Sequence, residues 1–350
     1  MVPVPHSAPP RTLRLPGRRR LISMATACAV ALGLVAYLVV AVVSGDGRGG
    51  LCVVRATGGG DGARHAPDAA RYELTAEGAA NAATITAVAS RRGLPERAVT
   101  IALATALQES GLRNIGHGDR DSLGLFQQRP SKGWGTERQI LDPVYSAGKF
   151  YDHLVKIPGY SRLPLTVAAQ RVQRSGYPQA YAKHEAGAAL LTAALTGRRA
   201  AALSCTTGGG DGGGDGEPGD PERVRAQLVR EFGRDVLTAS PKGGAERAAS
   251  GHRAGRALSP AADSGSGAGA GAGRKRARPA LSLPVRGERQ GWELAHWAVA
   301  QAGRLRIERV VYDGRVWSAD RARDGWRKTR AAADGPAARA EVALRLSAGQ

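Results

Sequence analysis

The chain has 350 residues, with 50 Lys and Arg against 30 Asp and Glu, so its formal net charge is +20. This excess of basic residues indicates anionic surroundings, such as wall polymer, a membrane surface or nucleic acid. The 48 glycines, 19 prolines and long Ala/Gly/Arg-rich stretches exclude a single core built from the whole length. No Cys/His spacing is that of a zinc site and no motif implies a cofactor, so we expect neither a metal nor a cofactor.

Residues 21–44 contain no charged residue and follow an arginine-rich stretch, residues 1–20. An apolar run of this length is long enough to span a bilayer as a helix, and the basic flank stays cytoplasmic. The pattern predicts a cytoplasmic tail (1–20), a transmembrane anchor (21–44) and a spacer (45–67). The protein would then be a single-pass protein of the cell membrane with an extracellular C-terminus. A cleaved signal peptide, which would give a protein secreted to the cell wall, is the alternative.

The three cysteines fit that topology. Cys28 lies inside the apolar run, whereas Cys52 and Cys205 bracket the most structured stretch of the chain. We therefore expect one disulfide between Cys52 and Cys205, made in an oxidising compartment. Two unpaired thiols are the alternative.

Residues 68–205 show apolar residues at helical spacing and a low β propensity, which predicts an all-helical domain. Caps and breakers mark the helix ends: Thr75 is a candidate N-cap, Gly93 and Gly111 are stops, and Asp142-Pro143 is a typical helix start. The expected helices lie at 76–92, 95–110, 143–157, 166–174 and 178–196.

Residues 206–284 are rich in Gly, Ala and Arg and predict a disordered linker that contains one helix near 223–236. A basic cluster within it, residues 274–278, is interpreted as a solvated spacer, with contact to an anionic polymer as the alternative. Residues 285–350 predict a small α+β domain: a helix at 291–303, two strands joined by Asp313-Gly314, and a last strand at 340–348. For most of its four tryptophans, core packing is favoured over a role as ligand platforms: Trp292, Trp297, Trp317 and Trp326.

One glutamate stands out in the helical stretch. The sequence ALQESGL delivers Glu109 to a glycine, and SLGLFQQ follows after a short polar loop. Glycosidic cleavage needs a proton on the departing oxygen, and a carboxylic acid supplies it near neutral pH when partial burial raises its pKa. A position where an apolar helix meets a loop suits that role. The alternative is an ordinary surface glutamate, whose charge would oppose the helix dipole.

Together, ALQESGL and SLGLFQQ resemble the lysozyme-like superfamily, in particular soluble lytic transglycosylases and goose-type lysozymes, over about residues 70–205. The resemblance implies that Glu109 is the catalytic acid and base. It also implies a set of substrate-binding residues in the two motifs: Ser110, Ser122, Gly124, Leu125, Phe126 and Gln127. The family's later Ala-Tyr-Asn motif has no clean match here. Four residues are candidates to replace it: Gln170, Gln173, Tyr177 and Tyr181.

A retaining glycosidase needs a second carboxylate about 5 Å from the acid, and an inverting one needs a more distant base. The resemblance implies that neither is required for lytic transglycosylases, because the C6 hydroxyl of N-acetylmuramic acid attacks and the same glutamate accepts its proton. Asp119 and Asp121 in the intervening loop are the candidates for a second group in a hydrolase. Anhydro-forming cleavage is preferred over hydrolysis.

The expected protein is thus mainly α, with a lysozyme-like all-helical domain after an N-terminal transmembrane helix and a small α+β domain on a disordered linker. Its expected activity is that of a peptidoglycan lytic transglycosylase or lysozyme-like glycosidase that cleaves the bond between N-acetylmuramic acid and N-acetylglucosamine. The expected partners are peptidoglycan glycan strands, the membrane, and a wall or protein partner for the C-terminal domain, but no nucleic acid. A non-catalytic peptidoglycan-binding or scaffold protein is the alternative.

Overall fold

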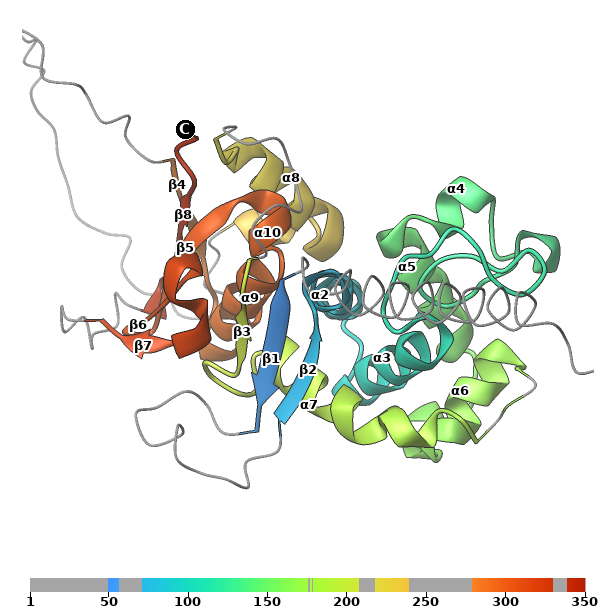
Figure 1. Ribbon diagram of the computed structural model, residues 1–350. Helices are drawn as coiled ribbons and strands as arrows, with labels where there is room; N and C mark the ends of the chain where they lie inside the picture. Colours follow the sequence, from blue (N-terminus) through green and yellow to red (C-terminus); the bar gives the residue numbers. More distant parts are fainter. Residues whose placement is uncertain are drawn as a thin grey trace, which may run out of the picture. The chain divides into compact units, whose positions relative to one another are not determined.

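The computed structural model describes residues 50–56, 71–175, 177, 179–207, 218–238, 279–329 and 339–349 (Figure 1). All of them belong to one compact unit, residues 49–350. The first part of this unit contains the elements β1 (Leu51–Arg55), β2 (Arg71–Thr75), α2 (Ala76–Arg91), α3 (Glu96–Ser110), α4 (Glu137–Ile140), α5 (Pro143–Leu154), α6 (Leu165–Gln173), α7 (Glu185–Leu195) and β3 (Leu203–Cys205). Short 3-10 helices lie at Pro130–Lys132 (η2), Tyr160–Arg162 (η3) and Ala182–His184 (η4).

The remaining elements belong to the C-terminal part. They are α8 (Pro221–Phe232), β4 (Ala280–Pro284), α9 (Glu288–Ala300), α10 (Ala302–Leu305), β5 (Ile307–Tyr312), β6 (Arg315–Ser318), β7 (Arg327–Lys328) and β8 (Glu341–Leu346), with 3-10 helices at Arg234–Leu237 (η5) and Ala319–Asp324 (η6).

The helix ends follow the local chemistry of the sequence. The Thr75 hydroxyl accepts a hydrogen bond from the Gly78 amide at 3.0 Å, which caps α2. Gly111 ends α3 in the left-handed conformation, with φ 64°. The Asp142 carboxylate caps α5 by accepting from the Val144 amide at 3.0 Å. These three helix boundaries were predicted correctly, because caps are properties of a few adjacent residues.

A three-stranded antiparallel sheet, in the order β2-β1-β3, corrects the prediction of an all-helical domain at 68–205. Its central strand, β1, lies in the predicted spacer, and the two outer strands lie at the ends of the predicted domain. These strands are three to five residues long, too short for an alternating pattern to be evident. They pair across long sequence separations, which no local pattern reveals.

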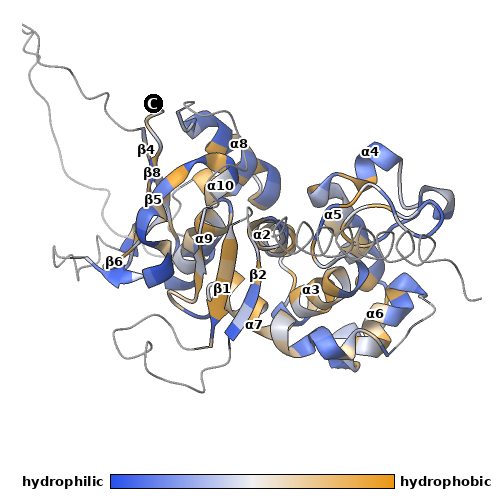
Figure 2. Ribbon diagram, in the orientation of Figure 1, coloured by the Kyte–Doolittle hydropathy of each residue, from blue (hydrophilic) through white to orange (hydrophobic). Residues whose placement is uncertain are grey.

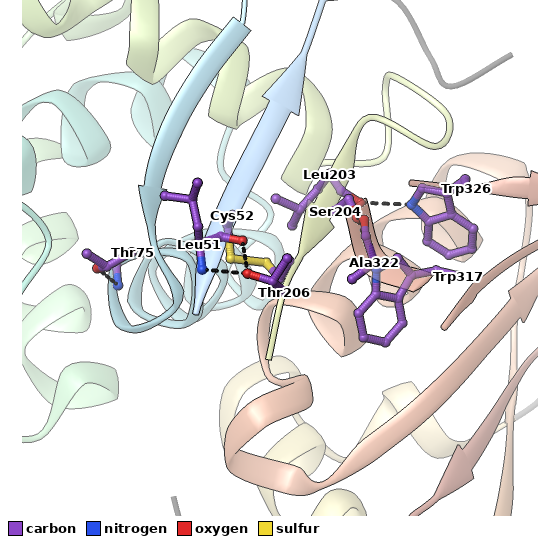
Figure 3. The surroundings of a disulfide bond; sticks show 11 residues. Leu51, Cys52, Thr75, Leu203, Ser204, Thr206, Trp317, Ala322 and Trp326 are labelled. Atoms are coloured by element: carbon purple, nitrogen blue, oxygen red, sulfur yellow. Dashed lines mark hydrogen bonds between the residues drawn. A yellow bond between two sulfur atoms is a disulfide. The ribbon is translucent and has the colours of Figure 1, made fainter. Parts of the chain in front are cut away.

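The disulfide between Cys52 and Cys205 is confirmed, and it joins β1 to β3 (Figure 3). The two cysteines are direct partners in the strand register and are both buried. At one end of the pair, the Thr206 hydroxyl accepts from the Leu51 amide at 2.8 Å. The bond therefore closes a loop that contains all the helices from α2 to α7.

A second antiparallel sheet, in the order β4-β8-β5-β6-β7, forms the C-terminal part. Its β5–β6 hairpin turns at Asp313-Gly314, where both residues have positive φ, as the sequence predicted. α9 packs on β5 and β8, and its buried residues include Trp292 and Trp297. In Figure 2, β1 of the first sheet carries the hydrophobic colours, whereas α8 is mostly hydrophilic.

Tryptophans of the C-terminal part dock it on strand β3. Trp317 donates from Nε1 to the Ser204 hydroxyl at 3.1 Å, and Trp326 donates to the Leu203 carbonyl at 2.8 Å (Figure 3). Every tryptophan named in the sequence analysis is at most 4% exposed, so core packing, expected for most of the four, holds for all of them. The two sheets therefore share one hydrophobic core.

His296 fixes the same interface from α9. Its Nε2 accepts from the Ala202 amide at 3.1 Å, and its Nδ1 lies 2.7 Å from the Ala194 carbonyl, to which it donates as the neutral tautomer. Burial lowers the pKa of His296 to about 4. Protonation of Nε2 would remove the acceptor for the Ala202 amide, so this contact requires the neutral ring.

Glu293, one turn before His296 on α9, has the opposite sign of pH dependence. Burial raises its pKa from 4.5 to about 7, although its carboxylate accepts a hydrogen bond from Ser90 on α2. Because the folded-state pKa lies above the unfolded one, folding favours the protonated form, and this stability is lost as the pH rises from 4.5 through 7.

We expect Glu293→Gln to leave stability nearly unchanged at pH 4.5 and to stabilise the protein by about 1–3 kcal/mol at pH 8. The reason is that the parent must bury a charge at the higher pH and the amide does not. Urea unfolding at the two pH values measures the difference. Glu288→Gln, at the exposed start of the same helix, is the control and should show no such pH dependence.

The prediction of a single-pass membrane protein at the cell membrane is corrected. Among the residues that the structure describes, no helix combines the length and the apolar character needed to cross a bilayer. The segment that carried the prediction, residues 21–44, and the tail at 1–20 lie outside the described residues. Most of the predicted linker, 208–217 and 239–278, lies outside them as well.

Candidate functional site

Glu109 lies in the last turn of α3 and is partly exposed. The helix is buried along most of its length and stops at Gly111, so the carboxylate stands where a core helix meets the loop that follows. The Tyr181 hydroxyl donates to Glu109 Oε1 at 2.7 Å. A charge-assisted hydrogen bond of this kind fixes the orientation of a carboxylate and stabilises its charged form.

Tyr181 is itself held from a second direction. Its hydroxyl lies 3.0 Å from Ser175 Oγ, which lies 3.0 Å from Gln170 Oε1, and Gln170 Nε2 donates to the Ser175 carbonyl at 2.7 Å. The tyrosine is fully buried, and burial, together with the nearby Glu109 carboxylate, raises its pKa well above the usual range. Tyr181 is therefore a neutral hydrogen-bond donor at physiological pH.

Ser110 ties the end of α3 to the following loop. Its buried hydroxyl lies 3.1 Å from the Ala106 carbonyl and 2.8 Å from the Leu125 carbonyl. The loop is a short hairpin-like turn, in which Leu123 and Gln128 exchange two backbone hydrogen bonds at 2.9 and 3.0 Å. Ser110, proposed from the sequence as a substrate contact, is thus placed as a link between helix and loop.

Gly124 allows this turn to pack closely. Its φ is 73°, and a Cβ added there would stand 2.8 Å from the Ile140 carbonyl oxygen. Its amide donates to the Ile115 carbonyl at 2.7 Å. The position therefore requires both the conformational freedom and the small size of glycine.

We expect Gly124→Ala to lower the free energy of unfolding by about 2 kcal/mol or more, because a strained backbone conformation and a steric clash coincide. Gly133→Ala is the matched control: its φ is 79°, but a Cβ there meets nothing within 4 Å. It should cost only the conformational strain, about 1 kcal/mol. Equal losses in urea unfolding of the two variants would contradict the steric argument.

Leu125 and Phe126 point into the core. Both are fully buried, and the Phe126 ring stacks on Phe150 with centroids 4.7 Å apart. Gln173, on α6, donates from Nε2 to the Phe126 carbonyl at 2.7 Å, while its Oε1 is buried without a partner. These residues position the loop, whose backbone is tied to the end of α3 through Ser110.

The remaining candidates are spread more widely. Gln127 is partly exposed, and its Nε2 lies 3.3 Å from the Gly124 carbonyl. Ser122 is buried, with its amide donating to the Asp119 carbonyl at 3.0 Å. Tyr177 is 79% exposed, and its amide donates to the Ser175 hydroxyl at 3.3 Å, so its side chain lies at the surface.

The two loop aspartates differ in availability. Asp121 pairs with Arg129 Nε at 2.6 Å and accepts from the Ser131 amide at 2.8 Å. Hydrogen bonds from Ser131, and then from Arg129, hold the pKa of Asp121 well below its usual range. The Asp121 carboxylate is thus already bonded to residues of its own loop, whereas the Asp119 side chain is exposed.

Sequence reasoning missed two residues near the site. Ser175 was not proposed, although it contacts Tyr181, and His184 was not proposed, although its Nε2 lies 3.2 Å from Gln108 Oε1 beside Glu109. No local signal distinguishes either residue from a surface polar residue. Within the described part of the chain, no group of three or more His, Cys, Asp or Glu side chains is arranged to hold a metal ion.

Comparison with known proteins concerns a different part of the chain. Residues 220–338 match a family model described as VldE, C-terminal domain. The matched range contains α8, β4, α9 and the strands β5 to β7, and it covers less than half of the chain. No curated protein matched the sequence. This similarity therefore concerns the C-terminal part and does not include Glu109 or the loop after it.

Proposed function

We propose that this protein is a peptidoglycan glycosidase that cleaves the bond between N-acetylmuramic acid and N-acetylglucosamine as a lytic transglycosylase. The observation that carries the proposal is the Glu109 carboxylate at the end of a buried helix, bonded to Tyr181. The backbone of the Gly124–Gln127 turn is linked to the same helix end through Ser110. A single oriented carboxylate beside a loop with backbone hydrogen-bonding groups suits acid and base catalysis on a sugar.

In this mechanism Glu109 serves twice. As the acid, it gives its proton to the glycosidic oxygen while the bond to C1 of N-acetylmuramic acid breaks. The C6 hydroxyl of the same sugar then attacks C1, and its proton passes to the Glu109 carboxylate, which restores the acid. Between the two steps, the hydrogen bond from Tyr181 stabilises the anion.

One feature of the loop supports this reaction over hydrolysis. A hydrolase would need a second carboxylate or base close to the scissile bond. Asp121, one of the two candidates, is held by Arg129 and Ser131. Only Asp119 is left as a candidate among the two, so the one-carboxylate reaction is preferred.

A non-catalytic peptidoglycan-binding protein is the second candidate. It is favoured by the burial of Leu125 and Phe126, which leaves their side chains unable to contact a sugar. Mass spectrometry of peptidoglycan digested by the purified, oxidised protein separates the possibilities. We expect anhydro-muropeptides. Reducing-end products would indicate a hydrolase and direct attention to Asp119, and no soluble product from several peptidoglycan types would indicate a binding protein.

We expect Tyr181→Phe to lower the cleavage rate by about 10- to 100-fold, which corresponds to the loss of one hydrogen bond to a charged group. Tyr160→Phe makes the same chemical change at a tyrosine of η3, which is not among the site candidates, and should leave the rate unchanged. Rates of muropeptide release at saturating peptidoglycan measure both. Equal effects of the two substitutions would remove Tyr181 from the site.

A further inference from the structure

The five-stranded sheet of the C-terminal part has one face in the core and one face turned away from α9. Leu281, Leu344 and Val310 are register partners across β4, β8 and β5, and all three are buried. Because side chains alternate along a strand, the neighbouring register row points to the opposite face. That outward row contains Ala280, Arg345, Arg309 and Ser318.

Arg309 and Arg345 face each other directly across β5 and β8. Like charges at directly opposite positions destabilise a sheet. Among the described residues, neither arginine forms an ion pair with a carboxylate. The Nε atom of Arg309 is buried and has no acceptor. This pair is therefore an electrostatic cost to the fold unless an anion lies between the two guanidinium groups.

A third guanidinium reaches the same row from β7. Arg327 donates from Nη2 to the Ser318 hydroxyl at 3.0 Å, and Ser318 is the register partner of Arg309. The Nε of Arg327 is also buried without an acceptor. Arg345, Arg309 and Arg327 thus form a cationic row, and two of its three members have an unused buried donor.

Two carboxylates lie near this row, and one of them, Asp320, interacts with Ser318 and Arg327 within it. Glu341 is four residues before Arg345 on β8, which places it about 13 Å away along the strand, and it accepts from Ser282. Asp320 is largely exposed and lies 4.0 Å from Arg321. A hydrogen bond from Ser318 lowers the pKa of Asp320. Neither carboxylate bridges Arg309 and Arg345.

We propose that the cationic row binds a phosphodiester polymer that carries no bases, such as a polyol-phosphate chain. Guanidinium groups match phosphate oxygens in a bidentate manner, and successive phosphates along a polymer would satisfy the donors of adjacent strands. The side chains on this face in the described part of the sheet are small or aliphatic: Ala280, Ser282, Val311 and Ala343, with Val316 buried beside them. A nucleic acid would therefore find no aromatic ring on which its bases could stack.

The test measures binding of the full chain to a fluorescent glycerol-phosphate polymer at several salt concentrations. Arg309→Gln/Arg345→Gln should weaken binding at least tenfold and reduce the salt dependence by about two units in log–log slope. If the double variant does not fold, the single variant Arg345→Gln, at an exposed position, replaces it in this test. Arg138→Gln/Arg223→Gln, which removes two exposed charges on α4 and α8, should change the affinity less than twofold.

Two further measurements distinguish bidentate recognition of phosphate from attraction to negative charge alone. Arg309→Lys/Arg345→Lys keeps the charge but removes the bidentate geometry, so it should still lose most of the affinity. Polyglutamate and oligo-dT of equal charge should bind more weakly than the glycerol-phosphate polymer. Unchanged binding by the double Gln variant, full retention by the Lys variant, or equal binding of either competitor would overturn the proposal. Loss of cleavage at Glu109 would leave this test unaffected, since the two proposals rest on different residues.

Discussion

Glu109→Gln is expected to lower the rate of peptidoglycan cleavage by about 100- to 10,000-fold, the range that one general acid or base contributes. The amide cannot give a proton to the departing oxygen, but it keeps the shape of the side chain and an oxygen that accepts from Tyr181. Folding and peptidoglycan binding should therefore persist. Muropeptide release followed by mass spectrometry, beside a thermal unfolding curve, measures both properties.

The matched control for this variant is Glu137→Gln, an exposed glutamate in the first turn of α4. It removes the same charge from the same part of the chain and should keep the full cleavage rate. Retained cleavage in Glu109→Gln would assign the reaction to another group, whereas parallel losses in both variants would indicate that charge, and not acid catalysis, is what the substitution changes.

Removal of the disulfide is expected to be the largest change in stability. Cys52→Ala/Cys205→Ala should lower the free energy of unfolding by about 2–5 kcal/mol, because the closed loop spans 153 residues and restricts the unfolded chain. The loss should reach the C-terminal part as well, since Trp317 and Trp326 bond to strand β3 beside Cys205. Urea unfolding followed by tryptophan fluorescence reports on both regions at once.

Cys28→Ala removes a cysteine that is not part of this disulfide and is the control for the loss of a cysteine as such. The same experiment also shows whether the protein unfolds in a single cooperative transition. If far-UV circular dichroism and tryptophan fluorescence gave separate transitions only in the double variant, the disulfide would be what couples the helices to the docked sheet. A midpoint equal to that of the parent would show that backbone pairing of β1 and β3 alone holds the loop closed.

The parts of the fold that were predictable rest on neighbouring residues. Thr75, Gly111 and Asp142 mark helix ends through their own side chains or backbone preferences, and Asp313-Gly314 favours a tight hairpin turn. The sheet β2-β1-β3 was missed for the opposite reason. Its strands pair over separations such as that between Val54 and Leu203, which leave no periodic signal in either segment.

In the candidate site, too, local features were predictable from the sequence and long-range contacts were not. A helix end with a glutamate, followed by a glycine-containing turn, is a local pattern and indicated Glu109 and Gly124. The sequence did not show that Leu125 and Phe126 point into the core, because contacts with distant residues such as Phe150 decide that. Nor did it show which tyrosine meets Glu109, since Tyr177 and Tyr181 lie close together in the chain but differ completely in burial.

The sequence by itself thus determined several helix ends, the hairpin and the position of a candidate acid, and the placement of the cysteines determined the pairing of Cys52 with Cys205. Tertiary structure alone decided that the C-terminal sheet docks on β3, that Tyr181 and Ser175 support Glu109, and that Arg309 faces Arg345. The physical reason is the separation along the chain between the residues that determine each feature. Caps and turns depend on the preferences of adjacent residues, whereas strand register, burial and side-chain contacts depend on which distant segments pack together.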